Sequence, residues 1–246
     1  MIKHPILVTG AAGGIGEAVS KKLMNSGFSV IALGRSIEAL EEKYKDEDNC
    51  HYIAYNLNDL DGIPNLIKEI TGKFGGLRGL VHCAGFDKLT PLYLSKVSDL
   101  EALFLIHAIA PIVLCGQIIK KGNAIGGCSI VLISSLAAHE GAIGHTSYAA
   151  AKGAIEGFLP SAAAELAEKK IRINIVVPGV VRTKMSAGFI DKLNEEQKTK
   201  LEASYPLGIG EPLDVANTII FLISDEAKWI TGQKFFIDGG HLCRRV

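Results

Sequence analysis

Residues 7–19, LVTGAAGGIGEAV, place four glycines between a short apolar run and a segment with helical spacing. Gly10, Gly14 and Gly16 form a G-x-x-x-G-x-G pattern, and Gly13 lies inside it. Glycine lets backbone N–H groups approach a ligand closely, and the N-terminus of the following helix attracts anions. A tight strand-to-helix turn alone also accounts for the glycines. Their position in the first such turn favours a dinucleotide pyrophosphate.

The same alternation of apolar runs and helical segments continues along the whole chain. Strands this apolar indicate a parallel sheet covered on both faces, so the sequence predicts a doubly wound α/β fold. We find no linker, which predicts a single domain over residues 1–246. The predicted strands are residues 5–9, 28–33, 51–55, 77–82, 129–134, 172–177 and 234–238, and the main helices lie near 14–26, 37–46, 60–73, 98–121 and 147–168.

Composition narrows the possible partners and the compartment. The formal net charge is zero and no long basic run occurs, which argues against nucleic-acid and membrane binding. The five cysteines are odd in number and form no C-x-x-C pair, so we expect reduced thiols in a cytoplasmic protein and no metal site. The first strand pattern begins at residue 5, which leaves no room for a signal peptide.

One stretch, residues 102–119, has the composition of a membrane span because it carries no formal charge. His107, Pro111 and Gln117 interrupt it, and it only just reaches spanning length. We therefore expect a helix of a soluble protein, buried on several sides.

The end of the second predicted strand bears on the choice of cofactor. NAD-binding folds usually hold an acidic residue there for the ribose hydroxyls, whereas residues 30–36 read VIALGRS. The guanidinium of Arg35 suits a 2′-phosphate, which favours NADPH over NAD. Arg35 could instead be a solvated loop residue, and Ser36 either adds a hydrogen bond to that phosphate or caps the next helix.

Residues 145–158, HTSYAAAKGAIEGF, are mostly small and apolar, yet they place a phenol and an ammonium one turn apart. Tyr148 and Lys152 share one helix face because they stand four residues apart. An ammonium stabilises a phenolate, so Lys152 would lower the pKa of Tyr148 and ease proton transfer. A surface tyrosine with an incidental lysine is the alternative.

Four segments occur in order and together resemble the short-chain dehydrogenase/reductase family, most closely its 3-oxoacyl-(acyl-carrier-protein) reductases and carbonyl reductases. The segments are TGAAGGIG at 9–16, a serine in LISSLAAHEG at 132–141, Tyr148-x-x-x-Lys152, and VVPGVVRT at 176–183. The resemblance covers essentially the whole chain. It implies a single-domain Rossmann fold with a seven-stranded parallel sheet between helical layers.

The resemblance also implies roles for individual residues. Tyr148 is expected to donate a proton to a substrate carbonyl, and Lys152 to bind the nicotinamide ribose as well as lower that pKa. Ser135 is expected to hold the carbonyl oxygen, with Ser134 a structural neighbour. The expected cofactor-binding residues are Gly10, Gly13, Gly14, Ile15, Gly16, Arg35, Ser36, Asn56, Leu57, Ala84, Gly85, Tyr148, Lys152, Pro178, Gly179, Val181 and Thr183.

The sequence departs from the family pattern in three places. Asn56 stands at the position that flanks the adenine, where the family usually has an aspartate. His82 and Cys83 stand where the family usually has two asparagines. His107 stands where the family has an asparagine that helps hold a proton-relay water. Histidine titrates near neutrality and can bind water, so His107 is a candidate catalytic residue in an altered relay. Alternatively, it is a satisfied helix histidine and the relay is impaired.

The segment 184–211 resembles the family's mobile lid over the substrate, and His139, His145 and Phe86 are candidates for the pocket wall. Two apolar helices, 98–121 and 147–168, need cover beyond the sheet, so we expect a homodimer or homotetramer. The sequence predicts an NADPH-dependent reductase that converts the ketone of a small-molecule or acyl-carrier substrate to a secondary alcohol. Alternatives are an NAD(P)-dependent alcohol or sugar dehydrogenase and a non-catalytic NADPH-binding sensor.

Overall fold

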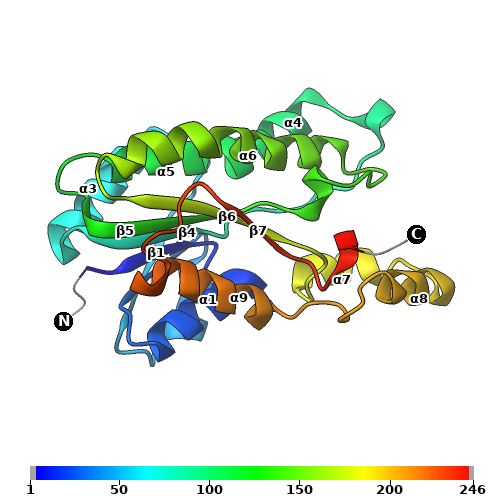
Figure 1. Cartoon of the computed structure of the whole chain (residues 1–246), viewed down its shortest axis with the longest axis horizontal. Helices are drawn as coiled ribbons and strands as arrows, with labels where there is room; N and C mark the ends of the chain where they lie inside the picture. Colours follow the sequence, from blue (N-terminus) through cyan, green and yellow to red (C-terminus); the bar gives the residue numbers. More distant parts are fainter. Residues whose placement is uncertain (1–3, 244–246) are drawn as a thin grey trace.

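A computed structural model describes residues 4–243 and shows one seven-stranded sheet between two helical layers (Figure 1). All neighbouring strands are parallel, in the order β3-β2-β1-β4-β5-β6-β7. This confirms the predicted fold. The strands are β1 Ile6–Thr9, β2 Val30–Gly34, β3 Cys50–Ala54, β4 Leu77–His82, β5 Ala124–Ile133, β6 Arg172–Pro178 and β7 Lys234–Ile237.

The helices divide between the two faces of the sheet (Figure 1). One face carries α3 (Ile63–Phe74), α4 (Val97–Phe104), α5 (Ala110–Ile118) and α6 (Thr146–Ala167). The other carries α1 (Gly14–Asn25), α2 (Ile37–Tyr44) and α9 (Pro212–Ile223). Two further helices, α7 (Lys184–Ile190) and α8 (Glu195–Ala203), lie beyond one end of these layers. Short 3₁₀ turns span Leu92–Leu94, Leu136–Ala138, Asp225–Ala227 and His241–Cys243.

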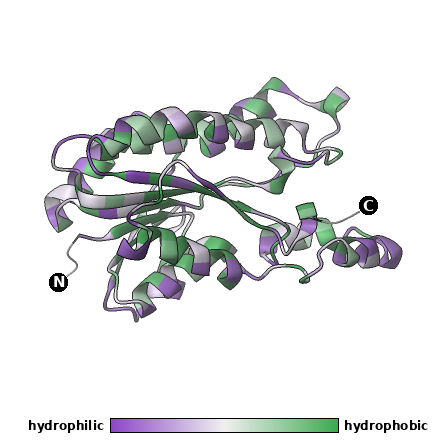
Figure 2. Cartoon of the chain, viewed as in Figure 1, coloured by the Kyte–Doolittle hydropathy of each residue, from purple (hydrophilic) through white to green (hydrophobic). Residues whose placement is uncertain are grey.

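Alternating side chains on each strand build two separate cores. Along β1, Leu7 packs in the core under α3, α5 and α6, while Ile6 and Val8 pack in the core under α1 and α9. All three are fully buried, as expected for a sheet covered on both faces. The sheet is green along most of its strands in a hydropathy view, whereas α8 is hydrophilic (Figure 2).

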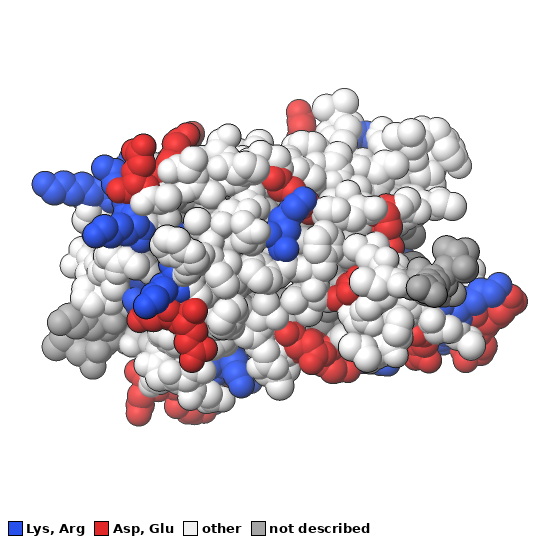
Figure 3. Space-filling view, in the orientation of Figure 1, with Lys and Arg blue, Asp and Glu red and all other residues white. Residues whose placement is uncertain are grey.

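Charged residues on the viewed face lie mainly towards its two ends, with both signs mixed (Figure 3). The broad surface between them is largely uncharged. Within the part of this face that the structure describes, lysines and arginines form no continuous stripe.

The apolar stretch forms one helical rod, Val97–Ile118, and by length and composition it could cross a membrane. Of the residues in its most apolar stretch, 33% are buried inside the chain. Within the single chain the rod meets α3, α6 and the sheet, so burial of its remaining sides stays a prediction that depends on another subunit. Ile109 (43% exposed) and Ile112 (36% exposed) lie on the open side.

A π-helical turn at Leu105–Ile109 separates α4 from α5. In this register the N–H of Ala110 donates to the carbonyl of Leu105, and the next N–H is missing because residue 111 is proline. The carbonyl of Ile106 is thus left without a backbone donor. His82 supplies one, with Nε2 3.0 Å from that oxygen. Its Nδ1 accepts from the Thr9 hydroxyl at 3.0 Å, so the buried ring is fully paired.

Candidate active site

The strand order reverses between β1 and β4, which opens a crevice at the carboxyl edge of the sheet. The glycine turn lies there and depends on its lack of side chains. Gly10 has φ +64°, and a Cβ on it would meet the Cα of Ala84 at 2.7 Å. A Cβ on Gly16 would lie 2.2 Å from the carbonyl oxygen of Gly10. Strand, turn and helix therefore approach as closely as a dinucleotide turn requires.

The start of α1 suits an anionic group. Gly13 is its N-cap and offers no side-chain acceptor, so the first N–H groups of the helix are not capped from within. A Cβ on Gly14 would lie 2.7 Å from Cγ2 of Thr183, which brings the loop after β6 across this turn. These residues fit a pyrophosphate between the helix and that loop.

The residues expected to bind the adenosine end of the cofactor differ in whether their side chains are exposed and free of other hydrogen bonds. Arg35 is exposed and forms no hydrogen bond or ion pair within residues 4–243. Ser36 caps α2 by accepting from the N–H of Ala39 at 3.2 Å, so the capping interpretation is correct. Asn56 is exposed, whereas Leu57 is 3% exposed and packs in the core. Only the backbone of Leu57 can reach a ligand.

A cavity of about 300 Å³ lies at this edge of the sheet. Its wall also includes Met185, Ser186, Phe189, Leu201 and Tyr205 from the segment 184–211. Of the other candidates for its wall, His145 lines the cavity, whereas His139 and Phe86 do not. The predicted site residues in the wall are Ile15, Gly85, His107, Ser135, Tyr148, Lys152, Pro178, Gly179, Val181 and Thr183, whereas Gly10, Gly13, Gly14, Gly16, Arg35, Ser36, Asn56, Leu57 and Ala84 lie outside it.

The serine, tyrosine and lysine meet on one side of this cavity. Ser135 lies close enough to Tyr148 for its side chain to lower the pKa of the phenol. Lys152 is 5% exposed, with Nζ donating to the carbonyl of Ile133 at 2.7 Å and lying 5.7 Å from the Tyr148 ring centroid. Ser134 instead donates to Glu156 at 2.5 Å, which supports a structural role for it. We refer to Ser135, Tyr148 and Lys152 as the catalytic side.

Ionisation of the catalytic side differs from the expectation. Burial raises the pKa of Tyr148, the charge of Asp87 raises it further, and only the hydrogen bond from Ser135 opposes this. Burial lowers the pKa of Lys152 to about 7, so its ammonium is only partly charged at neutral pH. The expectation that Lys152 lowers the pKa of Tyr148 stays a prediction, which concerns the charged ammonium. Tyr148 is protonated at neutral pH, as a proton donor must be.

His107 differs from both interpretations in part, and its place in a proton relay stays a prediction. Burial and the charge of Lys152 lower its pKa to about 2, so it does not titrate near neutrality. Its Nε2 lies 2.7 Å from the carbonyl oxygen of Phe86, but its Nδ1 is buried without a partner. It is therefore not a satisfied helix histidine either. A Cβ on Gly85 would lie 2.2 Å from Cε1 of the ring, so the glycine makes room for it.

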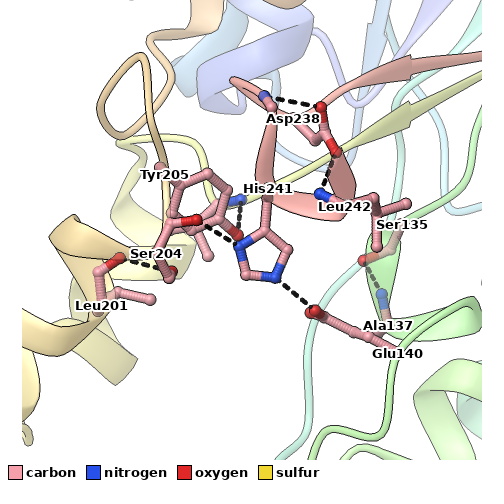
Figure 4. A network of polar contacts seen from close by, with 11 residues as sticks. Ser135, Ala137, Glu140, Leu201, Ser204, Tyr205, Asp238, His241 and Leu242 are labelled. Atoms are coloured by element: carbon pink, nitrogen blue, oxygen red, sulfur yellow. Dashed lines mark hydrogen bonds and ion pairs between the residues drawn. The ribbon is translucent and has the colours of Figure 1, made fainter. Parts of the chain in front are cut away.

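The sequence interpretation missed a contact between the C-terminal turn and the segment 184–211 (Figure 4). His241 lies with Nδ1 3.0 Å from the carbonyl of Ser204 and Nε2 2.8 Å from the carboxylate of Glu140, and it stacks on Tyr205 at 4.5 Å. Both acceptors are satisfied together only by a doubly protonated ring. Asp238 holds the turn by accepting from the N–H of Leu242 at 2.9 Å. No local sequence pattern indicates the contact between His241 and Glu140, because the two residues are 101 positions apart in the chain.

Sequence and structure comparisons agree on the relationship. The family model described as enoyl-(acyl carrier protein) reductase matches residues 10–241. The chain is 32% identical to carbonyl reductase family member 4 of Xenopus tropicalis, over 95% of each chain. It is 34% identical to the 3-oxoacyl-(acyl-carrier-protein) reductase of Thermotoga maritima, over 95% of this chain and 96% of that one.

Solved structures match over nearly the full length. A short-chain dehydrogenase/reductase from Brucella melitensis superposes with a TM-score of 0.89 at 27% identity, covering 98% of this chain and 97% of that one. The protein ElxO with NADP bound superposes with a TM-score of 0.87 at 28% identity, covering 99% and 100%. The chain therefore belongs to the short-chain dehydrogenase/reductase family of oxidoreductases.

Proposed function

We propose that this oxidoreductase reduces a ketone to a secondary alcohol with NADPH. The observation that carries the proposal is the meeting of Ser135, Tyr148 and Lys152 in one cavity beside the glycine turn. Relatives named as carbonyl reductases and 3-oxoacyl-(acyl-carrier-protein) reductases support it. Bound NADPH supplies the hydride, and the protein must orient the ketone and give its oxygen a proton.

Tyr148 and Ser135 perform the proton chemistry in this proposal. Both residues line the cavity, and Ser135 lies close enough to influence the pKa of Tyr148, so one carbonyl oxygen can contact both side chains. The raised pKa keeps Tyr148 protonated until negative charge develops on that oxygen, when it becomes a stronger acceptor. Ser135 then stabilises the remaining charge by donating its own hydrogen bond.

Lys152 positions the cofactor. An ammonium has three N–H donors, and the carbonyl of Ile133 accepts from Nζ at 2.7 Å. The other donors are available for the ribose hydroxyls of the nicotinamide. Their bonds favour the ammonium over the neutral amine, so cofactor binding raises the pKa of Lys152 from about 7.

The remaining cofactor assignments follow from position. Arg35 is exposed at the end of β2 and suits the 2′-phosphate, with Ser36 beside it, and ElxO has NADP bound. The pyrophosphate fits Gly10, Gly13, Gly14, Ile15 and Gly16, the adenosine lies near Asn56 and Leu57, and the nicotinamide and its ribose lie among Ala84, Gly85, Pro178, Gly179, Val181 and Thr183.

Three further expectations stay predictions. Residues 184–211 act as a substrate lid, which suits the position of Met185 and Phe189 in the cavity wall. A homodimer or homotetramer covers the open side of α5, where Ile109 and Ile112 are exposed. The protein is cytoplasmic.

A second candidate is an NAD(P)-dependent dehydrogenase that oxidises an alcohol or a sugar. Asp87 and Glu140 in the cavity wall favour it, because carboxylates bind hydroxyl groups well. The same catalytic side serves both directions. The chain also resembles diacetyl reductase of Staphylococcus epidermidis, at 32% identity over 97% of its length.

The test is to follow the absorbance of NADPH and NADH with a panel of ketones that includes a 3-oxoacyl thioester. We expect ketone-dependent consumption that is faster with NADPH at low cofactor concentration. Binding of NADPH without turnover of any ketone or alcohol would contradict the proposal and favour the sensor.

A further inference from the structure

Helix α6 carries three polar side chains on one face, those of Tyr148, Lys152 and Glu156. They follow one another at intervals of four residues, so each lies one turn beyond the last along the helix. Tyr148 and Lys152 line the cavity, whereas Glu156 lies outside its wall. The side chain of Glu156 is only 8% exposed, and a carboxylate buried to this extent needs partners.

Glu156 has three partners, and they come from other elements of the fold. Its Oε1 accepts from the Ser134 hydroxyl at 2.5 Å and lies 2.9 Å from Nε2 of His139. Its Oε2 accepts from Nζ of Lys234 at 3.0 Å. Burial raises the pKa of Glu156, but these hydrogen bonds outweigh it and leave the pKa below its usual value. The carboxylate can therefore only accept, so the ring of His139 carries a proton on Nε2.

One oxygen of Glu156 thus holds both ends of the segment 134–139. Ser135 is the second residue of this segment and the N-cap of its 3₁₀ turn. The Oγ of Ser135 accepts from the N–H of Ala137 at 3.2 Å, a bond that does not use the hydroxyl hydrogen (Figure 4). That hydrogen can be donated to a ligand, in a direction set by the backbone of the segment.

Beyond Ser134 the segment leaves the sheet and forms a local turn, in which the N–H of His139 donates to the carbonyl of Leu136 at 2.7 Å. Bonds within a turn fix its shape but not its position on the rest of the fold. Glu156 supplies contacts that tie the turn to α6, the helix that carries Tyr148. One carboxylate therefore joins the two elements that supply the hydroxyl groups of the catalytic side.

We propose that Glu156 is a positioning residue, which holds the Ser135 hydroxyl where one carbonyl oxygen reaches both Ser135 and Tyr148. The inference rests on the proposed reductase function, in which Ser135 donates to that oxygen. Misplacing a reacting group by about 1 Å can cost about 100-fold in rate. Because Glu156 acts through Ser135, its loss should matter only while that serine is present.

A double-mutant cycle tests this dependence with NADPH and either acetoacetyl coenzyme A or diacetyl, whichever the parent reduces faster. We expect Ser135→Ala to lower kcat about 100- to 1000-fold. Glu156→Ala should lower it about 10-fold in the parent, because the serine is displaced but still present. In the Ser135→Ala background, the same change should alter kcat by less than about 2-fold. The Kd of NADPH, measured by fluorescence titration, should stay the same, whereas a general loss of structure would raise it.

Glu165→Ala is the matched control, because Glu165 is exposed on the same helix, and it should leave kcat unchanged. Glu156→Gln keeps an acceptor oxygen in a side chain of nearly the same shape, so it should restore part of the rate lost in Glu156→Ala. Ser134→Ala removes one of the two bonds to the segment and should lower kcat less than Glu156→Ala does. Either of these two variants takes the place of Glu156→Ala in the cycle if that protein does not fold.

Two results would overturn the inference while sparing the proposed function. One is an equal loss of kcat from Glu156→Ala with and without Ser135, because the carboxylate would then act on the fold as a whole. The other is an unchanged kcat in Glu156→Ala while Ser135→Ala is impaired. An unchanged kcat in Ser135→Ala, or no reduction of any ketone, would instead contradict the proposed function and the inference with it.

Discussion

The two sides of the cavity differ in how their polar groups are paired. On the catalytic side, Lys152 donates to the Ile133 carbonyl and Ser135 accepts from the N–H of Ala137, so these two side chains are held in place before a ligand arrives. Elsewhere in the cavity wall, Asp87 and His107 each keep one buried side-chain atom, Oδ1 and Nδ1, without a hydrogen-bond partner among the described residues. Paired groups fix the geometry of the site, whereas unpaired buried groups cost stability.

The same contrast separates two buried histidines. His82 is paired through both ring nitrogens, to Thr9 and Ile106, and it repairs the π-helical turn that Pro111 leaves short of a donor. His107 lies within that turn, and only one of its ring nitrogens is paired. Both replace asparagines of the family pattern, yet only His107 lines the cavity.

The catalytic side should govern all ketones alike. Tyr148→Phe removes the proton donor, and we expect kcat to fall about 10²- to 10⁴-fold for every ketone that the parent reduces, because general acids contribute this much. The Kd of NADPH, measured by fluorescence titration, should change little. Tyr93→Phe is the control, because Tyr93 is 84% exposed. An unchanged kcat would show that Tyr148 is not the proton donor.

Lys152→Met tests whether burial of the ammonium costs stability. The pKa of Lys152 is about 7 in the folded chain and near 10.5 when unfolded, so the cost is fully present below pH 7 and disappears as pH rises to 10.5. We expect Lys152→Met to exceed the parent in unfolding free energy near pH 7, with the gap closing towards pH 10. Urea unfolding without added nucleotide measures both, and a gap independent of pH would refute the buried charge.

Arg35→Ala should act at the far end of the cofactor and leave both sides of the cavity unaffected. Losing one charge-assisted hydrogen bond to the 2′-phosphate should raise the KM for NADPH about 10- to 100-fold and the KM for NADH little. The kcat at saturating NADPH should stay the same. Equal rises in both KM values would remove Arg35 from the cofactor assignment.

We expect the smallest effects from substitutions of the two buried histidines, His82 and His107, and these effects should differ between the two. His82→Asn breaks two hydrogen bonds and leaves the Ile106 carbonyl without a donor, so we expect a loss of about 1–3 kcal/mol in unfolding free energy. His107→Asn breaks only the bond to Phe86 and should cost less stability. Thermal and urea unfolding measure both effects, and the reverse order of losses would contradict the pairing argument.

Local patterns were sufficient to predict the fold and much of the candidate site. The glycine turn depends on residues 10–16 alone, and the spacing of Tyr148 and Lys152 depends on one helical turn. Such features depend on a few neighbouring residues, so they can be recognised in the sequence before any tertiary structure is known. The alternating apolar runs likewise report burial on both faces of each strand.

Burial and long-range contact could not be predicted this way. The pKa values of Tyr148 and His107 depend on how completely the fold excludes water from each side chain. The spacing of residues in the sequence does not indicate this. Asp87 and His145 are 58 residues apart and meet only because β4 ends and α6 begins at the same edge of the sheet. The contact of His241 with Glu140 has the same origin.

The most direct test of the account traces the transferred hydrogen. NADPH carrying deuterium at its transferred position is incubated with hydroxyacetone and the protein, and the diol product is examined by mass spectrometry and NMR. We predict one deuterium on the carbon that was the carbonyl carbon of the ketone. Product formed from unlabelled NADPH in heavy water should carry no deuterium on that carbon. Product without the label, or no product while the cofactor stays bound, would contradict hydride transfer to a ketone in this cavity.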